Sequence, residues 1–219
     1  MFSSLLERIR KDTSFRIKLF LTLSFIYNIS YAIFLFVIGQ IYDSKWFFVM
    51  AIYYGLLSVV RIFIWLQMSP QKQLVSKIKT MRACGCFLLS INLAFSAMMF
   101  ILIFGNQYVK HHEIIVITLA TYTFTSLTMA IINSIKYLKR NDYLYSCAKI
   151  ISLIAASVSI VTLTNVMLST FGENNMLLRS VILPILSGVV SIFIIVCAIL
   201  MIRKSNLDLR KLKNEKERE

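Results

Sequence analysis

WFFVMAIYYGLLSVVRIFIWLQ, residues 46–67, holds a single charged side chain, Arg61, in an otherwise apolar run. A helix needs about 20 apolar residues to cross roughly 30 Å of hydrocarbon, and this run is long enough. Trp46 and Trp65 lie near its two ends, where aromatic side chains anchor a helix at the membrane interfaces. The segment is therefore predicted to be a helix that spans a lipid bilayer.

Five further runs of the same kind fill the chain almost from end to end. Of the 219 residues 58% are hydrophobic, whereas soluble domains reach roughly 45–50%. The six predicted spans are residues 20–41, 46–67, 84–104, 114–137, 143–168 and 177–202. Because the connections between them are short, we predict an all-α, polytopic membrane protein in which residues 1–219 form a single six-helix transmembrane domain.

Basic residues concentrate on alternate connections. They are found before the first span, between the second and third, between the fourth and fifth, and after the sixth. The opposite connections hold only Lys45, Lys110 and Arg179. The positive-inside rule then predicts cytoplasmic termini (N-in/C-in) in the cell membrane. Since the net charge of +14 follows this topology, we do not expect nucleic-acid binding.

Both ends of the chain are charged tails. Residues 1–18 mix Leu5, Leu6 and Ile9 with basic side chains, which predicts an amphipathic segment on anionic lipid headgroups. The plainer interpretation is a tail that only fixes topology. Residues 203–219 are predicted to be a charged, frayed extension of the last helix. The first span is too long for a signal peptide, so we expect it to remain as an anchor.

Three spans precede the middle of the chain and three follow it, so a duplication would produce inverted halves. Shifting the sequence by 95 positions places Tyr27 on Tyr122 and Tyr54 on Lys149, each pair in matching spans. Few other residues coincide. A 3+3 inverted repeat is therefore one prediction for the architecture, beside six helices without internal symmetry.

Small and polar residues mark the predicted contact faces, because helices in lipid gain little from burying apolar surface against each other. The fifth span carries a stripe of small residues at helical spacing: Ala148, Ser152, Ala155, Ala156 and Ser159. The fourth span is polar on two faces, with Thr121 and Thr125 on one, and Tyr122 and Asn133 on the other. We therefore predict that the fourth helix lies at the centre of the bundle.

Four asparagines lie within spans, where an unpaired amide is costly: Asn28, Asn92, Asn133 and Asn165. Interhelical hydrogen bonds, worth about 0.6–2 kcal/mol each, explain them simply. The alternative is that some of them line a hydrated path.

Two cations, Arg61 and Lys149, lie inside predicted spans, about 10 Å from the nearer helix end. A cation near the bilayer centre costs about 2.5–3.5 kcal/mol, although a shallow one can extend to the headgroups. No span contains Asp or Glu to neutralise them. If the two cations instead face a cavity, its contents are predicted to be anionic or neutral.

The sequence offers little for catalysis or metal binding. His111, His112 and Glu113 are adjacent and project to different sides of a helix, which disfavours a shared metal. No nucleophile–base pair or phosphate-binding glycine loop lies in the spans. We predict no enzyme activity, no cofactor and no metal. The four cysteines avoid the outer connections, so we expect free thiols.

Residues 27–64, YNISYAIFLFVIGQIYDSKWFFVMAIYYGLLSVVRIFI, resemble the first two helices of cation diffusion facilitators, and residues 120–163 resemble a later helix pair of that family. That family holds its metal with Asp and His in the second and fifth spans. Here Tyr53, Tyr54 and Ser58, then Lys149 and Ser152, occupy those regions. The resemblance implies a shared fold without metal transport. The chain also resembles small six-helix bacterial membrane proteins that have no assigned activity.

The leading hypothesis is a transporter-like protein whose polar cavity accepts an anionic or neutral small solute. Its candidate binding residues are Asn28, Tyr54, Arg61, Thr121, Thr125, Asn133 and Lys149. The competing hypothesis is an accessory or scaffold subunit that does not transport, docked through a lipid-facing small-residue stripe or the basic tail. Its partner would be a second copy of the chain or another membrane protein.

Overall fold

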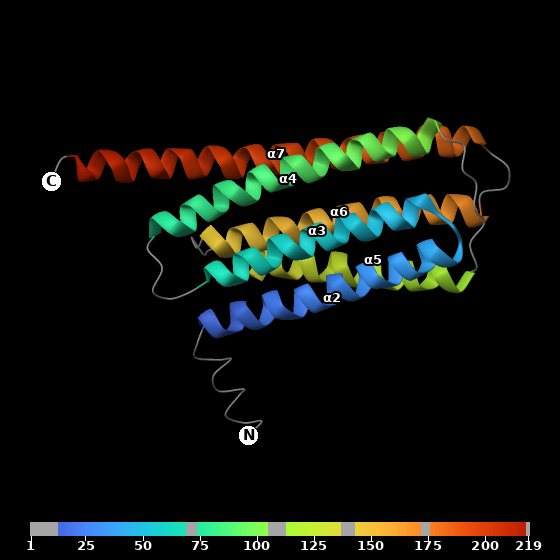
Figure 1. Cartoon of the computed structure of the whole chain (residues 1–219), viewed down its shortest axis with the longest axis horizontal. Coiled ribbons are helices and arrows are strands. Elements are labelled where there is room, and N and C mark those ends of the chain that lie inside the picture. Colours follow the sequence, from blue (N-terminus) through green and yellow to red (C-terminus); the bar gives the residue numbers. More distant parts are fainter. Residues whose placement is uncertain (1–12, 69–73, 105–112, 137–142, 172–175, 218–219) are drawn as a thin grey trace, which may run out of the picture.

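The computed structural model describes residues 13–68, 74–104, 113–136, 143–171 and 176–217, and within them it contains helices and no strand. The helices are α2 (Thr13–Ile41), α3 (Lys45–Gln67), α4 (Leu74–Phe104), α5 (Glu113–Lys136), α6 (Tyr143–Phe171) and α7 (Met176–Lys216). All six are long and apolar enough to cross a membrane (Figure 1). The predicted all-α, six-helix fold is therefore confirmed.

Two helices continue well beyond their predicted spans. Helix α4 begins at Leu74, and α7 runs on to Lys216 through residues predicted to fray. The extensions stabilise each other, because the Ser205 hydroxyl of α7 donates a hydrogen bond to the Ile78 carbonyl of α4 at 2.7 Å. Helical structure is set by the backbone and by packing, so it does not stop where the apolar residues end.

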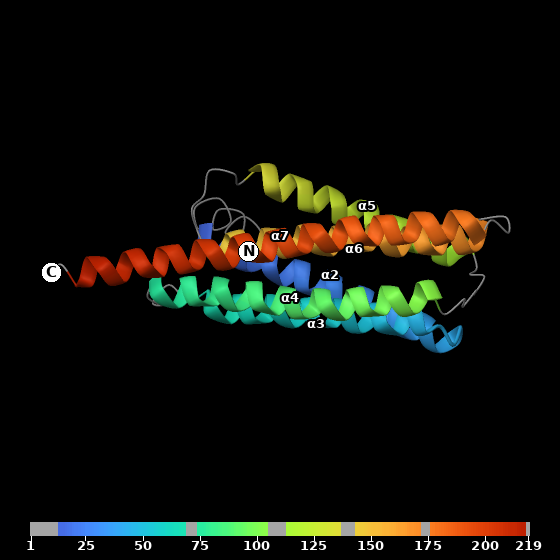
Figure 2. The same cartoon turned by 90° about the horizontal axis from the view of Figure 1, so that it is seen from above.

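Helix α6, and not α5, occupies the centre of the bundle. In the apolar segment of α6 67% of the residues are buried, against 28% in α5, which packs on α6 at the edge (Figure 2). The prediction of a central fourth span was wrong. The hydroxyls of Thr118, Thr121 and Thr125 bond to the carbonyls four residues earlier in α5, so this face needs no polar neighbour.

The small-residue stripe of α6 is buried inside the chain. Ala148, Ala155 and Ala156 are at most 2% exposed, and Ser159 is completely covered. The stripe packs on the other helices of this chain, which corrects the prediction that it faces lipid and docks a partner. Small side chains here let α6 approach several neighbours closely.

The helices are arranged as two antiparallel halves. Helix α2 pairs with α3 as α5 pairs with α6, and α4 of the first half packs along α7 of the second (Figure 1). Two contacts join residues that are 95 positions apart: Tyr27 stacks on Tyr122, and the Ser96 and Ser191 hydroxyls are hydrogen-bonded at 3.0 Å. Residues related by an inverted repeat can meet in this way at a two-fold axis, and the 3+3 inverted repeat stays a prediction.

Candidate binding site

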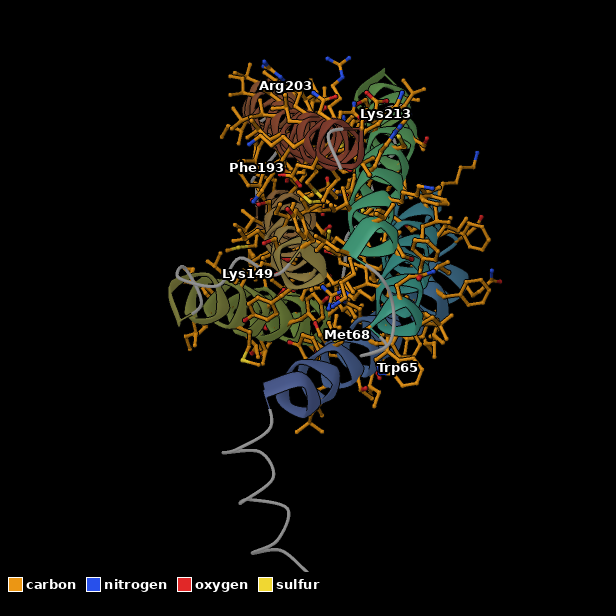
Figure 3. The ribbon with its side chains drawn as sticks, turned by 90° about the vertical axis from the view of Figure 1, so that its left-hand side faces the viewer. Trp65, Met68, Lys149, Phe193, Arg203 and Lys213 are labelled. Carbon is orange, nitrogen blue, oxygen red and sulfur yellow. The ribbon has the colours of Figure 1, made fainter. Side chains whose placement is uncertain are left out.

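A cavity of about 260 Å³ lies between α2, α3, α5 and α6. Its walls are formed by Leu23, Ser24, Tyr27, Asn28, Arg61, Thr125, Ser126, Met129, Ala130 and Ser152. These residues come from the first half of the apolar segments of α2 and α6 and from the second half of those of α3 and α5, so the cavity lies in one half of the bundle's length. The same end of the bundle faces the viewer in Figure 3, where Trp65 and Met68 mark the end of α3.

Arg61 forms the floor of this cavity and is only 3% exposed. One guanidinium nitrogen, Nη2, donates a long hydrogen bond of 3.5 Å to the Ser152 hydroxyl, which itself donates to the Ala148 carbonyl. The Nε and Nη1 atoms of Arg61 are buried and have no hydrogen-bond partner among the described residues. Arg61 is therefore a buried cation without an ion-pair partner among the described residues, and two of its three guanidinium nitrogens make no hydrogen bond there.

Asn28 supplies a second spare donor. Its Oδ1 atom accepts a hydrogen bond of 2.7 Å from the Tyr122 hydroxyl, whereas its Nδ2 atom is buried without a partner in the described part of the chain. The Tyr27 hydroxyl donates to the Tyr122 carbonyl at 3.2 Å and fixes α2 against α5. The amide of Asn28 is thus oriented with its N–H groups unused.

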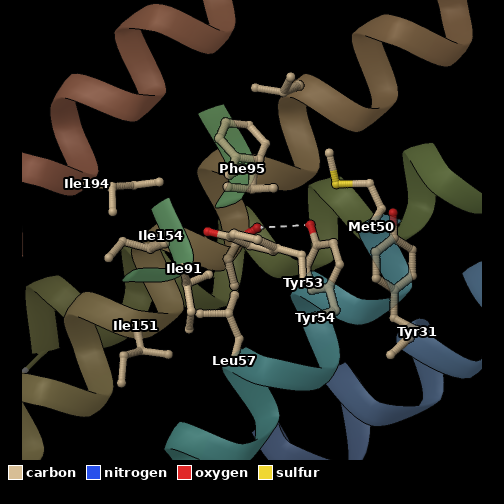
Figure 4. Close-up of a cluster of buried hydrophobic side chains, with 14 of the residues drawn as sticks. Tyr31, Met50, Tyr53, Tyr54, Leu57, Ile91, Phe95, Ile151, Ile154 and Ile194 are labelled. Carbon is tan, nitrogen blue, oxygen red and sulfur yellow. Dashed lines mark hydrogen bonds between the residues drawn. The ribbon is translucent and has the colours of Figure 1, made fainter. Parts of the chain in front are cut away.

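A tyrosine cluster closes the cavity toward the middle of the bundle. It consists of Tyr27, Tyr31, Tyr54 and Tyr122, whose rings stack or meet edge to face. The Tyr31 and Tyr122 rings are parallel at 3.4 Å, and Tyr54 meets Tyr31 at 88°. The Tyr54 hydroxyl donates to the Ala155 carbonyl of α6 at 3.3 Å. Figure 4 shows Tyr54 packed among Tyr31, Tyr53 and the apolar side chains that fill the core beyond the cavity.

The cavity brings together three of the residues predicted from the sequence: Asn28, Arg61 and Thr125. Tyr54 lies next to it in the tyrosine cluster. Thr121 is exposed, and its hydroxyl bonds to the Ile117 carbonyl of its own helix. The side chain of Asn133 lies outside the described residues.

Lys149 is not part of the cavity. Its side chain is partly exposed, and its ammonium group lies over the Tyr145 ring at 4.9 Å (Figure 3). The two cations therefore have different environments, although they lie at similar depth in their helices. Arg61 is buried and bonded to Ser152, whereas the ammonium group of Lys149 lies over an aromatic ring near the beginning of α6.

Three lining residues, Ser24, Tyr27 and Ser126, were not among the candidate binding residues predicted from the sequence. Ser24 lies on the same face of α2 as Tyr27 and Asn28, which are three and four residues further on, and Ser126 follows Tyr122 by one turn of α5. This helical spacing of polar residues was the sequence signal from which these lining residues could have been predicted. Ser152 was assigned to the small-residue stripe, since its sequence neighbours gave no sign that Arg61 of α3 lies opposite.

The described residues contain no group of three His, Cys, Asp or Glu side chains that could hold a metal ion. His111 and His112 lie outside the described residues. The donor set of the cavity, a guanidinium, an amide and hydroxyls, is suited to oxygen anions and unsuited to cations.

No known family model and no curated protein matches this chain. Its function therefore has to be inferred from the chemistry of the cavity. The fold itself places the chain in a broad class, because all six helices carry membrane-spanning apolar segments. The chain is an integral, multi-pass membrane protein.

Proposed function

We propose that the protein is transporter-like and binds a small anionic solute in the cavity at Arg61. The single observation that supports this most strongly is the buried guanidinium, of which two nitrogen atoms have no hydrogen-bond partner among the described residues. A neutral solute with hydrogen-bond acceptors is the weaker form of the same proposal.

The free-energy balance favours an anion. A cation within a span costs about 2.5–3.5 kcal/mol, and a single long bond to Ser152 offsets only part of this. A carboxylate or phosphate could accept a charge-assisted hydrogen bond from Nε or from Nη1, and such bonds are stronger than those between neutral groups. Such an anion would also neutralise a charge for which no described carboxylate forms an ion pair.

The two antiparallel halves give the proposal a mechanism. In transporters built from inverted repeats, one group of helices rocks against another around a site between the halves. Here the cavity lies between α2 and α3 of one half and α5 and α6 of the other. With the orientation predicted from the basic residues, the cavity lies in the cytoplasmic half of the membrane.

We propose binding and transport in preference to catalysis. The lining side chains are hydroxyls, an amide, a guanidinium and apolar groups. Neither Arg61 nor the hydroxyls act as a general base near neutral pH without an adjacent partner such as His.

The test uses purified protein reconstituted in phosphatidylcholine vesicles. We expect one or more members of a series of carboxylates and phosphates to raise the unfolding midpoint and to be taken up. Arg61→Gln should abolish both effects. Lys149→Gln is the matched control, since it removes an intramembrane cation outside the cavity, and it should retain both.

Arg61→Lys keeps the charge and loses the planar pair of donors, so we expect an intermediate result. If no anion of any chain length stabilises the protein or enters the vesicles, the proposed function is wrong. If Arg61→Gln and the parent protein take up the anion equally, Arg61 has no part in transport.

An accessory or scaffold role is the second candidate. The observation that favours it is the exposed, basic end of α7, where Arg203, Lys204, Arg210 and Lys211 lie on a helix that extends past the bundle (Figure 1). This surface suits anionic headgroups or an acidic partner. Stoichiometric recovery of one membrane protein after crosslinking, without uptake by the isolated protein, would favour this role.

A further inference from the structure

The cavity opens sideways, between α2 and α5. Four of its lining residues are also surface residues: Leu23 is 57% exposed, Tyr27 38% and Met129 47%, and Thr125 is exposed with its hydroxyl bonded to the Thr121 carbonyl of its own helix. Leu23 and Tyr27 belong to α2, and Met129 belongs to α5. Because these are the two least buried helices of the four that surround the cavity, the gap between them forms its mouth.

This mouth lies at the depth of the hydrocarbon. Arg61 is six residues before the end of α3 at Gln67, which corresponds to about 9 Å of helix. Met129 is likewise seven residues before the end of α5 at Lys136. The exposed neighbours on α2 and α5, Ile26 and Phe124, are apolar as well. A molecule that enters here comes from the lipid.

The inner end of the cavity is formed by buried polar side chains, and its accessible walls and mouth are mostly apolar. Arg61, Ser152 and Asn28 form the inner end, and Leu23 and Met129 form the rim. We infer that the site takes an anionic amphiphile, a carboxylate or phosphate group that carries an acyl chain. The headgroup is held by Arg61 and Asn28, and the chain leaves between α2 and α5 into the bilayer. This inference rests on the proposed function and names its substrate class.

The size of the cavity agrees with this division of the ligand. Pockets that enclose a whole small-molecule ligand measure about 300–1,000 Å³, and this one measures about 260 Å³. It accommodates a headgroup and the first part of a chain, so the remainder must stay outside. An acyl chain that is already in lipid can pass between Leu23 and Met129 without a free-energy cost. A free anion would have to give up its hydration shell to pass these apolar side chains.

The experiment compares anions that share a headgroup and differ in chain length. The protein is placed in phosphatidylcholine nanodiscs, and its thermal unfolding midpoint is measured with dodecanoate or dodecyl phosphate, with acetate or inorganic phosphate, and with dodecanol. We expect the two long-chain anions to raise the midpoint by about 5 °C at saturation. Acetate, inorganic phosphate and dodecanol should leave it unchanged.

Two variants locate the effect. In Arg61→Gln the long-chain anions should no longer raise the unfolding midpoint, because the guanidinium that donates to the headgroup is gone. Arg61→Lys replaces this variant in the measurement if Arg61→Gln fails to fold. Met129→Trp should also lose it, because the larger side chain fills the mouth while Arg61 is untouched. Met167→Trp is the matched control, since Met167 is equally exposed at 46% on α6 and does not line the cavity.

The outcomes separate this inference from the proposed function. If acetate or inorganic phosphate stabilises the protein as well as dodecanoate, and Arg61→Gln abolishes both effects, the amphiphile is wrong and anion binding stands. If dodecanol matches dodecanoate, the headgroup charge is irrelevant and the inference falls. If none of the five probes shifts the midpoint, both are overturned.

Discussion

Arg61 is expected to lower the stability of the ligand-free protein, and in the proposed function the same residue binds the anion. It is 3% exposed and leaves two buried N–H donors unpaired among the described residues. Apolar replacements of buried charges are often neutral or stabilising, so stability does not explain why an arginine occupies this position. A role in binding does explain it.

Replacing Arg61 by Met keeps much of the volume and removes the charge. We expect the free energy of unfolding of the ligand-free protein to rise by about 1–3 kcal/mol, and anion binding to be lost. Lys149→Met should change stability by less than about 0.5 kcal/mol, because Lys149 is already partly exposed. Reversible unfolding in mixed micelles measures both. A clear loss of stability in Arg61→Met would mean that the guanidinium is well satisfied.

The Tyr122 hydroxyl offers a second test at the level of single atoms. Tyr122→Phe removes the bond of 2.7 Å to Asn28 Oδ1 and leaves both polar atoms of that amide unpaired. We expect a loss of about 1–2 kcal/mol in the free energy of unfolding. The control Tyr27→Phe should lose less, since the Tyr27 side chain is 38% exposed. Equal losses of unfolding free energy in the two variants would show that the unpaired amide of Asn28 does not cause the destabilisation.

Among the elements, α4 and α7 form the closest pair, and a glycine makes this possible. A Cβ atom on Gly85 would lie 2.7 Å from Ile202 Cγ1 and 3.1 Å from the Ala198 carbonyl oxygen. Gly55 of α3 has open space at the corresponding position. Both glycines lie inside helices, so they share the same intrinsic penalty and differ only in their surroundings.

Gly55→Ala should therefore stabilise the protein by up to about 1 kcal/mol through helix propensity. Gly85→Ala should destabilise it by about 1–3 kcal/mol, because the added methyl group separates α4 from α7. The comparison of the two unfolding free energies cancels the propensity term. A stabilised Gly85→Ala variant would show that α4 and α7 have room to adjust.

The sequence was sufficient to predict helices, and insufficient to predict their order in space. Apolar length alone located six spans, because a backbone in lipid must satisfy its own hydrogen bonds. The position of α5 was not predictable from its composition, since threonines bonded within their own helix look the same in a sequence as threonines that face a neighbour. Arg61 and Ser152 are 91 residues apart, and no local pattern links them.

At the scale of the whole molecule, the α4–α7 pair packs beside the four helices that surround the cavity and joins the two halves. Ser96 and Ser191 meet within it, and the Ser205 hydroxyl bonds to Ile78 at its far end. If the proposed transport is correct, α2, α3, α5 and α6 move and this interface does not.

Ser96→Cys with Ser191→Cys tests this division, in a background that lacks the four native cysteines. The hydroxyls are 3.0 Å apart, so we expect the introduced thiols to form a disulfide on oxidation. Uptake by vesicles should stay within about two-fold of the reduced protein, as expected for a contact that does not open. Loss of uptake that a reductant restores would show that α4 and α7 separate during transport.

The unbroken run of α7 into its charged end has a mechanical consequence. Asp208 is still bonded to Tyr143 of α6, and at 1.5 Å per residue the stretch from Leu209 to Lys216 continues beyond it for about 11 Å as a stiff rod. Anything fused or bound there is held at a set distance and angle, without the slack of a tether. A rotation of α7 by a few degrees would swing that cargo sideways by an ångström or more, so the tip amplifies small tilts deep in the bilayer.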